Sequence, residues 1–477
     1  MKLSLIWDVV TVLMILFGIM TAGHALINKR DPKEAFGWIA VCIVFPFIGP
    51  FFYIAFGINR VQRRAKKLLQ RSSAFLDNEC GEVLRPDGCP APVPVVYASR
   101  AKIADRVSRW PVCSENRVTL LHNGEDAYPA MLEAIACAQR SIYLATYIFD
   151  VDKTGESFIT ALNKAHKRGV PVRVLVDGVG EMHWGTVATR SLREKGIPVA
   201  RYLPPTLFPP AFYINLRNHR KILVVDGEQA FTGGMNISDR HLVHAEGNAD
   251  SRTTDIHFRL EGPVARQIED VFIEDWQFVT GEILSPHPFP AGADGDSLCR
   301  VISDGPDEEM GNLYMVLSGV ISSAKQNIRI MTPYFLPPRG IMTALQTAAL
   351  RGVCIEVVLP EKNDSQFVHW ATRNLLWELL AYDARIYYQP PPFAHTKLLL
   401  VDDNYVQVGS ANIDARSLRL NFELNVEIYD QSMAQLLTNY FQNIKSRCRT
   451  VTLEEVDNRP LPERLRDSFA WLFSSYL

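Results

Sequence analysis

Two copies of one short pattern carry residue types suited to chemistry on a phosphoryl group. Each copy places a histidine, a lysine, an aspartate and an asparagine at the same spacings. The two sets are His219, Lys221, Asp226 and Asn236, and His395, Lys397, Asp402 and Asn412. An imidazole can act as a nucleophile or as a general acid and base, and a lysine supplies positive charge. A single HxK pattern is typical of a surface strand with two polar residues. Two copies in the same register predict one active site assembled from two half-sites.

The alternation of side chains along a strand places the histidine and the lysine of each copy on one face. Asp226 and Asp402 stand at odd spacings from their histidines, so on a regular strand they point to the other face. We therefore count them in the catalytic motif but expect a structural or turn-forming role without contact to substrate.

The asparagines of the two copies, Asn236 and Asn412, each follow a pair of small residues at the end of the next strand. Small residues there let backbone and amide donors approach a ligand closely. Together with the two lysines, these asparagines offer fixed positive charge and neutral donors to a phosphoryl group.

A histidine acting as nucleophile or acid needs an acceptor for its other ring nitrogen. Asp255 and Glu423 stand at the heads of alternating strands downstream of the two copies, and are our candidates for orienting the histidines. A surface acid at a strand edge explains each of them equally well. Arg240 and Arg416 lie at identical distances from their histidines, and either contact the same anion or pair with acids.

Length and composition limit the fold and the ligand. A chain of 477 residues is too long to fold around one ordinary hydrophobic core, so we expect two domains with appendages. A net charge of −2 gives no global case for nucleic acid. The eight cysteines are scattered without zinc-ligand spacing, which indicates a reduced compartment, with a Cys80–Cys89 disulfide as the minor alternative. The acids form no metal-ligand cluster that we identify.

Two long apolar runs at the N-terminus predict membrane segments. They cover Leu3–Ile27 and residues 35–58, and each is long enough for a membrane-spanning helix, which needs about 20 residues. A signal peptide is the competing interpretation of the first run, but a second apolar run follows at once. Pro46 and Pro50 predict that the second segment is kinked or re-entrant, and the sequence leaves open whether it crosses.

A basic stretch follows the second apolar run, with no acid among its charges. It contains Arg60, Arg63, Arg64, Lys66, Lys67 and Arg71. The positive-inside rule places this end, and the chain after it, in the cytoplasm. Such a cluster also attracts anionic head groups.

The remaining chain repeats an alternation of helices and apolar strands, which indicates two α/β domains. The expected helices are 128–139 and 313–325, and the expected strands are 141–147, 172–176, 327–332 and 355–359. The predicted divisions are a membrane anchor 1–71, a linker 72–116, a first domain 117–280, a linker 281–297 and a second domain 298–477.

The C-terminal segment 461–477 has an apolar helical face. It comprises Leu465, Phe469, Leu472, Phe473 and Tyr476. Such a helix either lies on a membrane surface or docks on the protein, and the sequence does not choose between them.

The paired HxKxxxxD motifs with GGxN and GSxN resemble those of the phospholipase D superfamily, and the match covers both halves. The N-terminal runs, with Pro46-Phe47-Ile48-Gly49-Pro50, are similar to the membrane anchor of bacterial cardiolipin synthases. Two further segments resemble their catalytic part, Thr332-Pro333-Tyr334-Phe335 and Lys362-Asn363-Asp364-Ser365. The first copy departs from the second at Gly234, where the second has Ser410, so one half lacks that hydroxyl.

The resemblance implies two pseudo-symmetric domains, each a mixed sheet flanked by helices, and phosphatidyl transfer in two steps. One imidazole attacks the phosphodiester to give a phosphatidyl-histidine, and the other protonates the leaving glycerol. The second imidazole then deprotonates an incoming phosphatidylglycerol, and cardiolipin forms. Family precedent makes His219 the nucleophile and His395 the acid and base, an order that the pseudo-symmetry leaves open. No cofactor or metal is implied, because Lys221 and Lys397 supply the charge.

The implied partners are phosphatidylglycerol, cardiolipin and the lipid bilayer, with no nucleic acid. The implied location is the bacterial inner (cytoplasmic) membrane, multi-pass, with the catalytic domains on the cytoplasmic side. Oligomeric state is not predicted. Three alternatives compete: a phospholipase D that uses water and yields phosphatidic acid, a superfamily nuclease, and a non-enzymatic scaffold. The near-neutral charge and the membrane tether disfavour the nuclease, and two intact motifs disfavour the scaffold. Whether water or a lipid alcohol is the acceptor depends on how the site excludes solvent, and the motifs do not show this.

Overall fold

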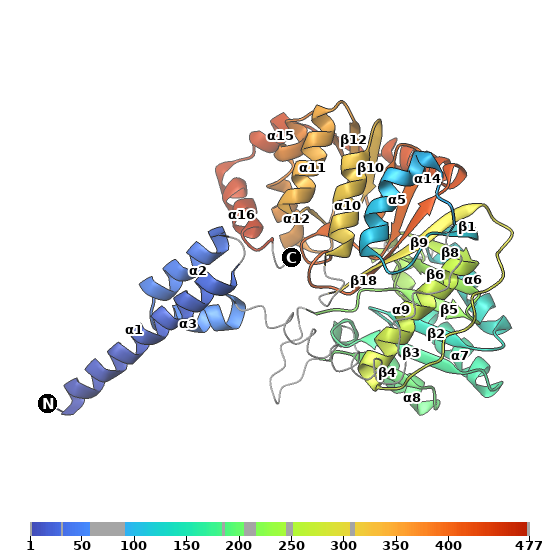
Figure 1. Cartoon of the computed structure of the whole chain (residues 1–477), viewed down its shortest axis with the longest axis horizontal. Helices are drawn as coiled ribbons and strands as arrows, with labels where there is room; N and C mark the ends of the chain where they lie inside the picture. Colours follow the sequence, from blue (N-terminus) through green and yellow to red (C-terminus); the bar gives the residue numbers. More distant parts are fainter. Residues whose placement is uncertain are drawn as a thin grey trace. The chain divides into compact units, whose positions relative to one another are not determined.

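The computed structural model describes residues 2–29, 32–57, 91–183, 187–204, 216–244, 251–305 and 311–474 (Figure 1). It forms two compact units, Met1–Lys67 and Leu68–Leu477. The basic stretch 60–71 and the Cys80–Cys89 pair lie outside the described residues. The predictions that rest on them stay predictions.

The first unit consists of helices built from the two apolar runs. They are α1 (Lys2–Asn28), α2 (Pro32–Val44), α3 (Gly49–Phe52) and a π-helical turn (Tyr53–Gly57). Within the described residues, one stretch, Trp7–Asn28, is long and apolar enough to cross a membrane. The second run breaks after Val44, just before Pro46, which lacks the N–H that helix continuation needs. The predicted kink is therefore confirmed.

The second unit is organised around a continuous sheet of 15 strands. From its centre outwards, the first half contributes β1 (Cys113–His122), β8 (Ile256–Glu261), β6 (Gln229–Gly233), β5 (Ile222–Val225), β2 (Ile142–Thr146), β3 (Val172–Asp177) and β4 (Val199–Tyr202). The second half contributes β9 (Ser297–Asp304), β18 (Glu423–Tyr429), β16 (Tyr405–Gly409), β15 (Leu398–Val401), β10 (Asn327–Met331), β12 (Cys354–Pro360), β13 (Arg385–Gln389) and β19 (Arg449–Val451). The halves join where β1 pairs antiparallel with β9.

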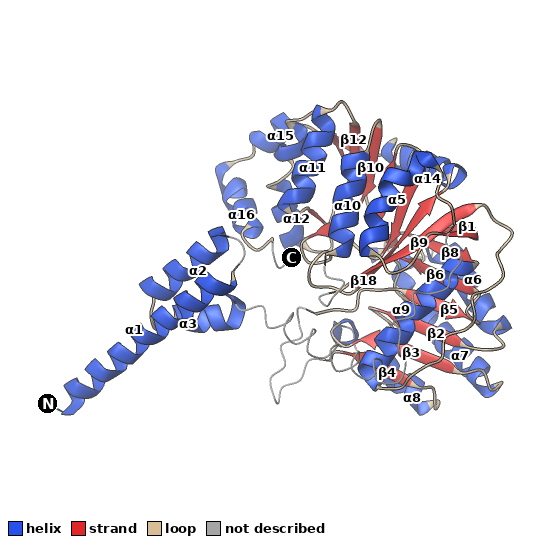
Figure 2. Cartoon of the chain, in the orientation of Figure 1, coloured by secondary structure: helices blue, strands red, loops and turns tan. Residues whose placement is uncertain are grey.

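Helices cover the sheet on both faces (Figure 2). In the first half they are α6 (Asn123–Cys137), α7 (Lys153–Lys167), α8 (Ala188–Glu194) and α9 (Pro263–Thr280). In the second half they are α10 (Asn312–Ser323), α11 (Arg339–Leu350), α12 (Gln366–Arg373), α13 (Trp377–Leu380), α14 (Gln431–Lys445), α15 (Leu453–Asp457) and α16 (Leu461–Trp471). Burial on both faces explains why β5 and β15 are uninterrupted apolar runs. The predicted α/β class, helices and strands are confirmed.

The segment predicted as a linker, 72–116, contains a helix and the start of β1. Helix α5 (Val95–Val107) begins after Pro94, a position where proline's fixed φ suits a helix start. Its Ala101 and Ala104 are buried in the core of the second half, and Arg100 forms an ion pair with Asp402. Residues 95–116 therefore belong to the folded second unit. The limits proposed for two domains stay a prediction, because both halves share one sheet.

The motif aspartates lie in turns and do not reach the histidines. Asp226 follows β5 and Asp402 follows β15, and both have a positive φ, of 57° and 52°. The Asp226 carboxylate accepts backbone N–H groups from Gln139, Arg140 and Ser141. That of Asp402 accepts those of Lys325, Gln326 and Asn327. Both aspartates therefore lie in turns and point away from the histidines, as strand alternation predicted, and their part in catalysis stays a prediction.

Asp226→Ala is expected to destabilise the protein without removing the chemistry. Three backbone donors lose their acceptor, which costs about 1–3 kcal/mol. Thermal unfolding of the full chain in detergent measures the loss, and turnover below the transition should be retained. Asp226→Asn, which keeps an acceptor oxygen, is the control. An Asp226→Ala protein with unchanged Tm and abolished turnover would contradict the assignment.

Candidate active site

Both copies of the motif open into one cavity of about 670 Å³ between the two halves of the sheet. Its lining includes six of the predicted residues: His219, Asn236, Arg240, His395, Asn412 and Arg416. Each histidine is held by backbone from the other half. The His219 N–H donates to the Phe422 carbonyl over 2.9 Å, and the His395 N–H donates to the Thr254 carbonyl over 2.8 Å.

The two histidines are oriented by acids that cross between the halves. His219 Nδ1 lies 3.2 Å from Glu423 Oε2 and 3.1 Å from the Ser410 carbonyl oxygen. His395 Nδ1 lies 2.8 Å from Asp255 Oδ2. Both carboxylates are buried. Asp255 and Glu423 therefore contact the histidines, as predicted, but each acid serves the histidine of the opposite copy. A neutral imidazole whose Nδ1–H donates to the acid presents the Nε2 lone pair.

The difference between Gly234 and Ser410 follows from the two acids. Ser410 Oγ donates to Glu423 and helps to hold the longer carboxylate behind His219. In the first half, a Cβ on Gly234 would overlap the Asp255 carboxylate. The Asp255 carboxylate thus occupies the space that a serine side chain at position 234 would need. The two halves reach the same arrangement with different residue pairs.

The motif lysines lie beneath the histidines and are buried. Lys221 Nζ donates to the His219 carbonyl over 2.6 Å, and Lys397 Nζ donates to the His395 carbonyl over 2.7 Å. Lys397 Nζ also lies 3.0 Å from His395 Nε2. Burial lowers the pKa of Lys221 to about 7 and that of Lys397 to about 8, although Glu423 and Asp255 oppose the shift. Both ammonium groups can lose a proton near neutral pH.

Burial also keeps both imidazoles neutral. It lowers the pKa of His219 to about 4, with Lys221 adding to the effect, while Glu423 opposes it. It lowers the pKa of His395 well below its usual value, again with help from its own lysine, Lys397. At neutral pH each histidine is therefore an uncharged base. An incoming phosphate would bring the negative charge that favours the imidazolium form.

The two asparagines differ in their surroundings. Asn236 Oδ1 accepts the Ile148 N–H over 3.2 Å, which fixes its amide. Asn412 Oδ1 is buried and has no hydrogen-bond partner among the residues that the structure describes. Both side chains line the cavity, where they can reach an anion that binds there.

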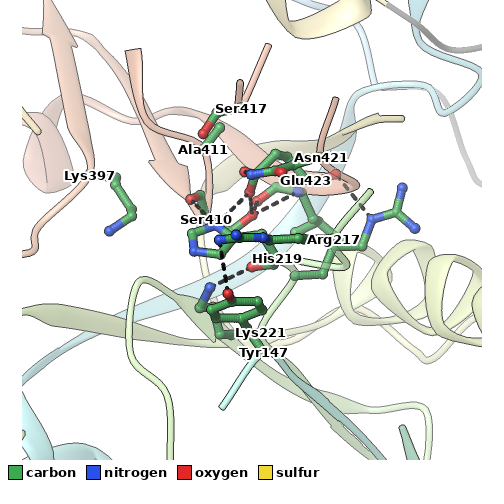
Figure 3. Close-up of polar contacts among 12 residues, drawn as sticks. Tyr147, Arg217, His219, Lys221, Lys397, Ser410, Ala411, Ser417, Asn421 and Glu423 are labelled. Atoms are coloured by element: carbon green, nitrogen blue, oxygen red, sulfur yellow. Dashed lines mark hydrogen bonds and ion pairs between the residues drawn. The ribbon is translucent and has the colours of Figure 1, made fainter. Parts of the chain in front are cut away.

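Arg217 is a site residue that the sequence analysis missed. It stands two residues before His219 and lines the same cavity. Its Nη1 donates to the Tyr147 hydroxyl over 3.1 Å, and the Tyr147 and His219 rings lie 5.2 Å apart (Figure 3). Burial and the neighbouring Arg217 lower the pKa of Arg416 to about 10. The strand alternation that pairs His219 with Lys221 also puts residue 217 on their face and could have revealed it.

Arg220 is a second missed residue, and it joins the two halves. Its buried guanidinium pairs with Asp275 at 2.7 Å and donates to the carbonyls of Glu423 and Asp304. The Arg220 side chain therefore fixes the backbone that presents Glu423 to His219. Among the described residues, no group of three or more His, Cys, Asp or Glu side chains has metal-site geometry.

Comparison with known proteins places this arrangement in a family. The family model described as "Cardiolipin synthase, PLD-like domain" matches residues 131–276 and 317–445. A cardiolipin synthase from Geobacillus thermodenitrificans is 32% identical over 94% of this chain and 90% of its own length. The major cardiolipin synthase ClsA of Bacillus subtilis is 32% identical over 98% of this chain and 99% of its own. The chain belongs to the phospholipase D-like cardiolipin synthase family.

Each matched segment of this phospholipase D-like protein holds one motif, which confirms the resemblance across both halves. The family model described as "Phospholipase_D-nuclease N-terminal" matches residues 6–57, the helices of the first unit. Phosphatidylserine synthase of Haemophilus influenzae shares the fold, with a TM-score of 0.61 at 16% identity. The likeness covers 79% of this chain and 100% of that one.

The site predicts a pH profile with a wide acidic plateau. His219 must be neutral, which holds above about 4, and Lys221 and Lys397 must be cationic, which holds below about 7 and 8. The turnover at low substrate concentration should therefore fall as pH rises through these values, because positive charge is lost. Initial rates on vesicles across pH test this, with circular dichroism as the folding control. Rates that climb steadily from about pH 6 to about pH 9 would contradict it.

Proposed function

We propose that this protein is a cardiolipin synthase, a phosphatidyltransferase that joins two phosphatidylglycerol molecules and releases glycerol. The observation that carries the proposal is the pair of neutral histidines in one cavity. Each imidazole contacts a buried acid, and the backbone carbonyl of each histidine accepts a hydrogen bond from a buried lysine. The relatives named cardiolipin synthase, which match nearly the whole chain, support it. No cofactor enters the proposed reaction.

In the proposed first step, His219 Nε2 attacks the phosphorus of one phosphatidylglycerol. The negative charge of the bound phosphodiester favours the imidazolium form of His395. As the bond from phosphorus to the head-group glycerol oxygen breaks, this imidazolium delivers its Nε2 proton to that oxygen. Phosphatidyl-histidine and free glycerol result. The contact between Lys397 Nζ and His395 Nε2 supports this order, because it connects His395 to a proton donor.

In the proposed second step, His395 takes the proton from a terminal hydroxyl of the second phosphatidylglycerol. The resulting oxygen displaces His219 from phosphorus, which gives cardiolipin and restores both imidazoles. Lys221, Lys397 and the two asparagines stabilise the charge on the phosphoryl oxygens in both steps.

The acceptor lipid carries a second phosphate, which takes no part in the chemistry. We assign Arg217 and Arg416 to it, because two guanidiniums in one cavity are stabilised by an intervening anion. The equivalent of Arg217 in the second copy is Phe393, whose ring lies 5.8 Å from that of His395. The two sides of the cavity thus differ in charge, as two different lipid positions require. Arg240 also lines the cavity and supplies further positive charge.

The proposed location is the bacterial inner membrane. Helix α1, which is long and apolar enough to span a bilayer, supports this location. We further propose that the second apolar run also enters the bilayer, which makes the anchor multi-pass if this run crosses. The positive-inside rule, applied to the basic stretch 60–71, supports a cytoplasmic position for the second unit, which holds the cavity and is called the catalytic unit from here on. The partners are then lipids and the bilayer, with no nucleic acid.

His219→Ala and His395→Ala should each leave a folded, membrane-bound protein with turnover reduced by about 1,000-fold or more. Labelled phosphatidylglycerol in vesicles provides the assay. Cardiolipin with an equal amount of glycerol supports the synthase. Phosphatidic acid as the main product of the unmodified protein would identify a hydrolase, and near-normal turnover of either variant would remove the two-histidine mechanism.

Arg217→Gln should weaken the second lipid's binding and spare the first step. We expect a KM for acceptor about tenfold higher, the cost of one charge-assisted contact. The burst of glycerol from the first step should be unchanged. Arg190→Gln, at an exposed arginine on α8, is the charge-matched control. An equal loss in the burst and in cardiolipin formation would assign Arg217 to the donor phosphate.

A further inference from the structure

The C-terminal helix α16 presents an apolar stripe to solvent. Leu461, Leu465, Phe469 and Leu472 are 66%, 62%, 58% and 67% exposed. Their spacing puts them on one side of the helix. Trp471 and Phe473, at the end of the stripe, are also exposed. Isolated exposed apolar residues need no explanation, but a continuous stripe marks an interaction surface.

The opposite side of α16 is firmly attached to the catalytic unit. Asp467 is fully buried and forms ion pairs with Arg459 and Arg466, and it lies 3.6 Å from Arg373 Nε on α12. The Arg466 guanidinium lies over the Trp370 ring at 4.6 Å. The helix therefore docks through its polar face. This geometry leaves the apolar face outward and unburied.

Helix α12 connects this surface to the cavity. Its first turn contributes Val368 to the cavity lining, and Ser365 just before it also lines the cavity. The same short helix packs against α16, as Figure 1 shows. The outward stripe is thus one helix away from residues that meet the substrate.

We propose that the apolar stripe of α16 inserts into the boundary between head groups and acyl chains of the bilayer, beside the cavity of the catalytic unit. The inference rests on the proposed function only for the choice of a phospholipid as the molecule that must leave the bilayer. An exposed apolar stripe that ends in aromatic residues is typical of helices that lie in the membrane interface.

Two observations favour a bilayer over a second protein copy. The stripe is one helix wide, whereas a stable protein interface buries about 1,200–2,000 Å². The exposed Arg464 lies next to Leu465, which suits anionic head groups. Glu463, the acid on this helix besides Asp467, is already paired with Arg373.

The first test replaces Leu465 of the full chain with a photo-crosslinking amino acid. The protein is reconstituted in vesicles of phosphatidylglycerol and phosphatidylethanolamine that carry a radiolabel. We expect labelled lipid adducts at position 465 and none at position 350, an exposed leucine at the end of α11. A cross-linked protein dimer, or no adduct at position 465, would overturn the proposal. The readout needs no activity, so it stands whether or not cardiolipin is the product.

The second test separates docking from chemistry. Leu465→Glu with Phe469→Glu should reduce turnover of bilayer phosphatidylglycerol about tenfold or more, since charges oppose insertion. Turnover of a short-chain phosphatidylglycerol present as monomers should be unchanged. Leu350→Glu is the matched control and should alter neither rate. Equal losses on both substrates would show a structural role for the stripe, and unchanged bilayer turnover would remove the proposal.

Discussion

The crossed contact between each histidine and an acid of the opposite half is the constraint on which the site depends. His219 is held by Glu423, and His395 by Asp255. Neither half contains a complete, oriented imidazole by itself. The pairing of β1 with β9 joins the halves into one sheet, and both contacts cross between these halves. The duplication is therefore visible in sequence as two motifs, but chemically it is a single site.

Burial of these groups is costly, and the same cost tunes their chemistry. Removing histidines and lysines from water lowers their pKa values. The imidazoles are therefore neutral, and the lysine ammonium groups have pKa values close to neutral pH. The buried acids partly offset this shift, and they hold the imidazole rings in one orientation. Arg217 and Phe393 give the two half-sites a difference in charge, in addition to their different acids. The proposed reaction uses two copies of one lipid in different roles, and this difference in charge suits the two roles.

The substrate of the proposed reaction is a membrane component, so the protein must reach the bilayer. Two places in the fold present apolar surface for this. The first unit supplies an apolar helix of membrane-spanning length. In the catalytic unit, α16 binds through Asp467 and its arginines and leaves its apolar stripe outward. The two sequence-based interpretations of this helix, docking and membrane contact, are therefore compatible, because they use opposite faces.

The sequence by itself determined the α/β alternation, the duplicated motif and the faces of its side chains, because these depend on spacing along one strand or helix. It also placed Asp226 and Asp402 away from the histidines, as the structure has them. Only the tertiary structure decided which acid meets which histidine, that Arg217 lies near Arg416, and that α5 packs on the second half. Those contacts join residues far apart in the chain. Periodicity specifies the face on which a side chain lies, whereas its partner depends on how the sheet closes around the cavity.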